Sequence, residues 1–166
     1  MPPNFNLPFV LSVAGAFLTS SVVAYIYVWP AVRAMPRFDA LKLLAVFHAF
    51  RFLGMNFLVS GFVSSALSSD FATKVGWGDL IAAVLALVSM AALSWRWSIA
   101  IPIVWIFNIW GTLDLLNAYY MGAKIADPGL FGAGIYIPAL YVPLLLVSHV
   151  LAFMILSKGT STEKTA

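Results

Sequence analysis

The sequence predicts an all-α integral membrane bundle of five transmembrane helices, and two observations lead to that fold class. First, 63% of the 166 residues are hydrophobic, only 9% are charged, and the mean hydropathy is +0.98. A soluble domain averages roughly 45–50% apolar and about 25% charged residues. This composition excludes a soluble globular protein, and it excludes a disordered chain, which would be poor in hydrophobic residues. Second, the chain contains five apolar runs of about 20 residues, the length that crosses a bilayer.

The expected spans, in chain order, are residues 7–29, 41–67, 75–95, 99–120 and 131–156. The first ends before Pro30, and it lacks the basic start of a signal peptide. The third must include residues 75–79, because its uninterrupted apolar run is too short to cross alone, so we expect Asp79 near the outer interface. The connections are short. We therefore expect one domain, residues 1–156, followed by a polar cytoplasmic tail, residues 157–166.

Basic residues at the ends of the spans predict the orientation of the bundle. One side carries Arg33, Arg37, Lys42, Arg96, Lys158 and Lys164, and the other carries Lys74 and Lys124. The side richer in Lys and Arg faces the cytoplasm. The N-terminus is therefore expected outside and the C-terminus in the cytoplasm, in a multi-pass protein of the cell (inner) membrane.

Cysteine content and net charge limit which bonds, metal sites and binding partners are expected. The chain has no cysteine, which excludes disulfides and thiolate metal sites. The net charge of +3 is explained by the orientation signal and does not indicate nucleic-acid binding. The expected partners are the lipid bilayer and an apolar small molecule, and an oligomer is compatible with the sequence.

A few polar residues within the spans mark the candidate site, because such groups are costly in a membrane and usually face the bundle interior. A helical rise of about 1.5 Å per residue sorts them into three layers by depth. From the cytoplasmic side outward, the layers hold His48 and His149, then Arg51 and Asn108, then Asn56, Asp79 and Asp114.

Helical spacing predicts one polar face on the second span. In an α-helix, steps of three and four residues place His48, Arg51, Phe52, Met55 and Asn56 on one side. In the fifth span, Pro143 is expected to free the carbonyl of Ala139 and to kink the helix.

Each polar residue also has a structural interpretation. Arg51 has only Asp79 and Asp114 as counter-ions, and a structural ion pair is one interpretation. Two acids against one base leave an excess negative charge, which a protonated carboxyl, a bound cation or a charged His would balance, and a protonated carboxyl could act as a general acid. Asp79 follows Gly78 and fits the N-cap or first turn of a helix. Asn108 is typical of hydrogen bonding between membrane helices.

Four segments resemble a group of small uncharacterised bacterial multi-pass membrane proteins. These are LLAVFHAFRFLG (43–54), GWGDLIAAVLAL (76–87), WIFNIWGTLDLLNA (105–118) and YIPALYVPLLLVSHV (136–150). The group's shared polar and glycine positions match His48, Arg51, Gly78, Asp79, Asn108, Gly111, Asp114 and His149. The resemblance implies that these residues form one site, and it implies no particular reaction.

The leading functional hypothesis is an enzyme or binding protein that acts on a lipophilic small molecule by acid/base chemistry. Arg51 would bind an anionic or oxygenated head group, while a carboxyl or a histidine would move protons. The candidate catalytic residues are His48, Arg51, Asp79, Asp114 and His149. The candidate ligand-binding residues are Met55, Asn56, Trp105, Asn108 and Tyr141.

Two alternatives remain open from the sequence. The cofactor is not fixed, and haem b is the candidate, because His48 and His149 lie on different helices at matching depth and would be the two axial ligands. The other alternative is a transporter subunit or a structural accessory subunit, in which the polar groups form a relay or only specify packing.

Overall fold

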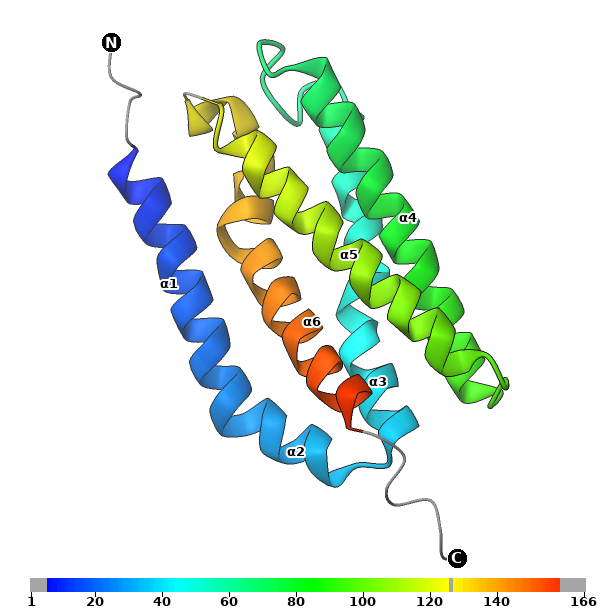
Figure 1. Cartoon of the computed structure of the whole chain (residues 1–166). Helices are drawn as coiled ribbons and strands as arrows, with labels where there is room; N and C mark the ends of the chain where they lie inside the picture. Colours follow the sequence, from blue (N-terminus) through cyan, green and yellow to red (C-terminus); the bar gives the residue numbers. More distant parts are fainter. Residues whose placement is uncertain (1–5, 126, 159–166) are drawn as a thin grey trace, which may run out of the picture.

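The computed structural model describes residues 6–125 and 127–158, and this part of the chain is helical, without strands (Figure 1). The α-helices are α1 (Leu7–Val23), α2 (Trp29–Ala34), α3 (Arg37–Val46), α4 (Ser69–Ser94), α5 (Ala100–Gly122) and α6 (Val142–Ser157). Four further segments wind differently: the π-helices η1 (Ala24–Val28) and η4 (Ile137–Tyr141), and the 3-10 helices η2 (Phe47–Leu58) and η3 (Pro128–Ile135). The expected tail from residue 159 onward lies outside the described residues.

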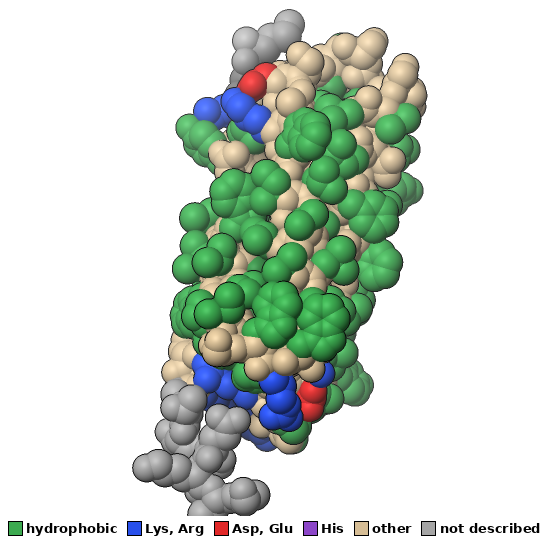
Figure 2. Space-filling model, turned by 90° about the vertical axis from the view of Figure 1, so that its right-hand side faces the viewer, with side chains coloured by type: hydrophobic (Ala, Val, Ile, Leu, Met, Phe, Trp, Pro, Cys, Tyr) green, Lys and Arg blue, Asp and Glu red, His purple; other side chains and the backbone are tan. Residues whose placement is uncertain are grey.

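Consecutive segments join into five continuous helices that are long and apolar enough to cross a membrane, which confirms the expected number. They are Leu7–Ala34, Arg37–Leu58, Ser69–Ser94, Ala100–Gly122 and Ile137–Ser157. The first helix begins, and the last one ends, at opposite ends of the bundle (Figure 1). On the face shown in Figure 2, hydrophobic side chains cover the middle, and Lys and Arg side chains gather at both ends.

The first helix differs from its expected range because Pro30 does not end it. The helix continues to Ala34 and stops only before Pro36, where Met35 is extended. A π-turn precedes the proline: the N–H of Trp29 donates to the carbonyl of Ala24, five residues back. The wider turn relieves the clash that a proline ring makes with the preceding turn of an α-helix.

The second helix ends at Leu58 rather than at residue 67, because its second half is a 3-10 helix. A 3-10 helix rises about 2.0 Å per residue, so fewer residues are needed to reach the other end of the bundle. The chain after it forms a loop that pairs with η3: Ser64 N–H donates to Leu130, and Ala133 N–H donates to Phe62.

The third helix begins earlier than expected, at Ser69, and this changes the interpretation of Asp79. Ser68 is the N-cap, and its side chain accepts a hydrogen bond from the N–H of Phe71. Asp79 therefore lies well inside α4 and is buried, so it is neither an N-cap nor a first-turn carboxylate.

Helix α4 is the centre of the bundle and packs against α3, η2 and α5. Its buried face contains Ala82, Ala83 and Ala86, and small residues let helices approach closely. Helix α1 is peripheral: it packs against α6 and η4, and none of its residues is buried.

Candidate functional site

Arg51 is the centre of a charged cluster that joins three helices. Its side chain, which is 0% exposed, comes from η2 and lies between one carboxylate from α4 and one from α5. Its Nε and Nη2 lie 2.8 and 2.7 Å from Oδ1 of Asp79, and Nη2 donates to Oδ2 of Asp114 at 2.5 Å. Its Nη1 donates to the carbonyl of Gly111 at 3.2 Å. The guanidinium is therefore held by protein groups in three directions.

The 3-10 winding of η2 explains which of its residues face this cluster. Side chains three residues apart align in a 3-10 helix. His48, Arg51, Gly54 and Phe57 follow that spacing, and all four are buried. The face expected from α-helical spacing is therefore wrong in part. Phe52, which was assigned to it, is 48% exposed.

Three glycines make room for the polar groups. A Cβ atom on Gly54 would collide with the carboxylate of Asp79, and one on Gly78 would collide with that of Asp114. A Cβ atom on Gly111 would lie 2.6 Å from Nε2 of His149. Gly78 and Gly111 belong to the sequence pattern and Gly54 does not, but all three serve close approach between helices, and each faces a side chain of the site.

His48 and His149 are in contact inside the bundle, as their matching depth along different helices predicted. Their ring centroids are 4.1 Å apart, and both rings are buried against Phe107. This places the histidine pair next to the charged cluster, because Nη1 of Arg51 lies beside the same face of Gly111 as the His149 ring.

Hydrogen bonds fix the tautomer of His149. The side-chain amide of Asn108 donates to the backbone carbonyl of His149, so its oxygen faces Nδ1 of the same histidine at 2.5 Å. Nδ1 must then carry the proton, because an amide oxygen can only accept. Nε2 of His149 is left as a buried lone pair without a partner among the described residues. Asn108 thereby joins α5 to α6, as expected for an interhelical hydrogen bond.

The same reasoning assigns His48. The hydroxyl of Ser148 donates to the carbonyl of Leu44, so its oxygen accepts from Nε2 of His48 at 3.3 Å. Nδ1 of His48 is the second buried nitrogen without a partner in the described chain. Tyr141 supports the same region, because its hydroxyl donates to the carbonyl of Phe47 where α3 changes to η2.

The two histidines do not fit the haem hypothesis in this arrangement. Bis-histidine ligation places one imidazole on each side of the porphyrin plane. Here the rings pack directly against each other at a tilt of 46°, which leaves no space for a plane between them. Apart from haem, no group of three or more His, Cys, Asp or Glu side chains that could hold a metal ion occurs within residues 6–125 and 127–158.

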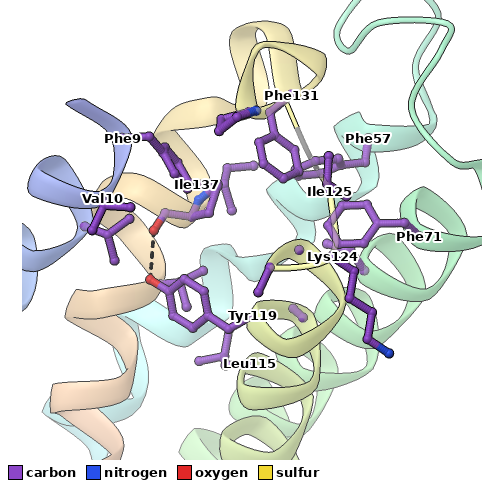
Figure 3. A pocket seen from close by; sticks show the side chains of 18 of the residues that line it. Phe9, Val10, Phe57, Phe71, Leu115, Tyr119, Lys124, Ile125, Phe131 and Ile137 are labelled. Atoms are coloured by element: carbon purple, nitrogen blue, oxygen red, sulfur yellow. Dashed lines mark hydrogen bonds between the residues drawn. The ribbon is translucent and has the colours of Figure 1, made fainter. Parts of the chain in front are cut away.

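A cavity of about 720 Å³ opens beside the charged cluster. All five long helices and η3 contribute to its wall, which is largely apolar and aromatic (Figure 3). Two of its lining residues are Asp79 and Asp114, whose side chains are 9% and 14% exposed. The other lining residues include Phe9, Val10, Val13, Ala14, Phe17, Phe57, Phe71, Val75, Leu115, Ala118, Tyr119, Phe131, Ile137 and Val142.

Tyr119 ties the cavity wall to the proline-containing turn of the last helix. In η4, the N–H of Val142 donates to the carbonyl of Ile137, five residues back. In that register Pro143 faces the carbonyl of Pro138 and has no N–H to donate. The hydroxyl of Tyr119 donates to this carbonyl at 2.8 Å (Figure 3). The carbonyl that Pro143 leaves without a backbone donor is therefore that of Pro138, and not that of Ala139 as expected. The reason is that the turn is a π-helix rather than an α-helix.

Several expected ligand-binding residues lie away from the cavity. Trp105 packs against Phe153, and Met55 and Asn56 are half-buried on η2 outside the line of buried residues. Arg51 is not among the residues that line the cavity; it lies behind the two carboxylates. Of the polar residues expected in the site, only Asp79 and Asp114 reach the cavity.

The largest group that sequence reasoning missed is on α1. Phe9, Val13 and Phe17 line the cavity at four-residue spacing, and Val10 and Ala14 form a second such row. The spacing is a helical stripe, so the signal was present. It carries no polar residue, however, and a search for polar groups passes over it.

Comparison with known proteins gives one match. A family model described as a domain of unknown function (DUF8737) matches residues 8–157. No curated protein and no solved structure matches the chain. The matched range covers all five long helices except the first residue, Leu7, so the polar cluster and nearly all of the cavity wall lie within the family's domain.

Proposed function

Since the chain belongs to the DUF8737 family, whose domain includes all but the first residue of the five-helix bundle, we propose that it is an integral membrane protein that binds a lipophilic small molecule. The five long apolar helices and the charged residues at both ends of the bundle support membrane insertion. The excess of Lys and Arg at the end near α2 supports a cytoplasmic location for that end.

One observation carries the binding proposal: an apolar cavity of about 720 Å³ ends on two carboxylates held by a buried arginine. Binding sites for small molecules are mostly apolar cavities of about 300–1,000 Å³ with a few polar groups that orient the ligand. Asp79 and Asp114 are the charged groups at that position here, because Arg51 is covered by them.

The proposed chemistry is acid/base chemistry at these carboxylates. Asp114 lines the cavity and is the more exposed of the two carboxylates, so it is the proposed proton donor or acceptor for the ligand. Asp79 accepts two contacts from Arg51 through a single oxygen and holds the guanidinium in place. Nε2 of His149 has no partner among the described residues, but His149 does not line the cavity, so we do not propose that it acts on the ligand directly.

Native mass spectrometry of the purified protein, released from lipid nanodiscs, tests binding. We expect a fraction of the wild type to carry a discrete added mass, identified by mass spectrometry of an organic extract. The variant Ala118→Phe fills the cavity and should lose this mass. Leu116→Phe is the matched control, because Leu116 is on the same helix and is 51% exposed on the outside.

Two outcomes contradict the proposal. One is a wild type that releases as the bare chain even after incubation with membrane lipid extracts. The other is equal retention of the added mass by Ala118→Phe and Leu116→Phe, which would place the molecule on the outer surface.

A further inference from the structure

The charges around the inner end of the cavity do not balance. Arg51 contributes one positive charge, and Asp79 and Asp114 contribute two negative charges. The remaining titratable groups packed here are His48 and His149, and their hydrogen bonds are satisfied by the neutral tautomers. When both carboxyls are ionised, the cluster has one negative charge in excess, which either a proton on one carboxyl or a bound cation compensates.

The two carboxylates have hydrogen-bond acceptors that Arg51 does not use. Oδ1 of Asp79 and Oδ2 of Asp114 accept from Arg51. The other two oxygens, Oδ2 of Asp79 and Oδ1 of Asp114, have no hydrogen-bond donor among the described residues, and both carboxylates border the cavity. Ionised carboxylates only accept hydrogen bonds. These two oxygens lie against Gly54 and Gly78, and they are the hydrogen-bond acceptors left over in the two carboxylates that border the cavity. Arg51 contributes no donor to the cavity wall.

This arrangement reverses the expectation that Arg51 holds an anionic head group. The guanidinium is 0% exposed and is separated from the cavity by the carboxylates. An anionic group entering the cavity would meet two like charges first. A cationic group would meet opposite charge and free acceptors.

The wall of the cavity also suits a cation. Phe9, Phe57, Phe71, Phe131 and Tyr119 surround it, and aromatic faces attract ammonium groups (Figure 3). The one basic residue that lines the cavity is Lys124, whose ammonium lies 3.9 Å from the centre of the Tyr120 ring. Figure 3 shows the Lys124 side chain pointing away from the aromatic wall, so it does not neutralise the carboxylates.

We propose that the ligand is a lipophilic amine whose ammonium group pairs with Asp114 and Asp79 and whose apolar body fills the aromatic cavity. This inference rests on the proposed function and specifies its ligand class. Charge neutralisation of the cluster and the two free carboxylate oxygens are the features that select a cation over a neutral or anionic molecule of the same shape.

The test compares three probes with one alkyl chain: decylamine, decanol and decyl sulfate. Their affinities are measured by native mass spectrometry from phosphatidylcholine nanodiscs, with partition into empty nanodiscs subtracted. We expect decylamine to bind at least about tenfold more tightly than decanol, as for other charge-assisted hydrogen bonds, and decyl sulfate to bind most weakly. Equal or tighter binding of decanol or decyl sulfate overturns the amine inference while leaving the cavity proposal in place. Absence of binding by all three probes contradicts the proposed function itself.

The variant Asp114→Asn assigns the preference to the carboxylates. It leaves one carboxylate for one guanidinium, so the excess charge disappears. We expect decylamine to lose about tenfold in affinity and decanol to change less than about twofold. Asp70→Asn is the matched control, because Asp70 is an exposed acid paired only with Lys74. If Asp114→Asn does not fold, the ranking of the three probes on the wild type still decides the inference.

Discussion

The bundle is packed differently on the two sides of Arg51. Toward α2 and the start of α3, the core is built from small and branched residues, among them Ala40, Ala92, Ala100 and Ala152. Toward η3, the core is a cluster of large rings that includes Phe57, Phe71 and Phe131, and the cavity lies beside it. Small side chains let helices close on each other, whereas rings hold them apart.

The site lies at the boundary between these two regions, and the difference explains its polarity. In the closed half, the carbonyl of Gly111 accepts a hydrogen bond from Arg51, and Asn108 holds His149 by two hydrogen bonds. The open half exposes only the carboxylates. The chain thus hides its positive charge in the closed half and presents its negative charge to the cavity.

The largest expected effect comes from removing the charge at the boundary. Arg51→Met leaves two carboxylates without their cation in a buried site. Loss of one partner of a buried ion pair typically costs about 3–5 kcal/mol of unfolding free energy. SDS or thermal unfolding in detergent measures this cost.

Arg33→Met is the control, because Arg33 is exposed at the end of α2. Its unfolding free energy should change by less than about 1 kcal/mol. Comparable unfolding of both variants would show that the buried cluster contributes nothing special to stability.

A medium effect is expected from glycines that differ only in their surroundings. Gly78→Ala places a methyl group against the carboxylate of Asp114, and overpacking of this kind costs about 1–3 kcal/mol. Gly15→Ala adds the same methyl group to α1, where no atom lies within 4 Å. There, alanine should be neutral or stabilise the helix by up to about 1 kcal/mol.

The same detergent-unfolding assay compares the two glycine variants. Equal stability changes would mean that Gly78 does not serve close approach between α4 and α5. A selective loss at Gly78 would localise the tight contact at the boundary.

The sequence predicted the number of helices and the pairing of the polar residues better than their winding. Composition and the length of apolar runs decide how many helices form, and depth along a helix brought His48 and His149 to one level. The 3-10 winding of η2 was not predicted, because the step from His48 to Arg51 fits an α-helix as well. The three-residue series that continues through Gly54 and Phe57 is the signal that distinguishes the two.

The residues that line the cavity were not predicted, although the four-residue spacing of those on α1 is visible in the sequence. The cavity wall is made of apolar residues in a chain that is 63% hydrophobic, so Phe9, Val13 and Phe17 do not stand out. Whether such residues fill a core or line a cavity depends on how far apart the helices stand. That distance is set by the packing of α1 against α6 and η4, which no local pattern encodes.

The smallest effects should come from two hydroxyl groups that satisfy backbone carbonyls on opposite sides of the boundary. Ser148→Ala removes both the donor to the buried carbonyl of Leu44 and the acceptor for Nε2 of His48 in the closed half. Leaving a buried carbonyl unsatisfied costs about 1–3 kcal/mol. Tyr119→Phe removes the donor to Pro138 beside the cavity, where a water molecule can replace it. We expect a cost of about 0.5–1 kcal/mol there, because a bridging water restores most of the hydrogen bond.

Detergent unfolding of both hydroxyl variants measures this contrast between a closed and an open half. Tyr120→Phe is the control for the tyrosine change, because Tyr120 is 64% exposed on the outside of α5. A larger loss for Tyr119→Phe than for Ser148→Ala would mean that water does not reach Pro138. The cavity would then have to be dry, and the ammonium group of a bound amine would enter without its hydration shell. Its affinity for the carboxylates would in that case depend entirely on the contacts with Asp79 and Asp114.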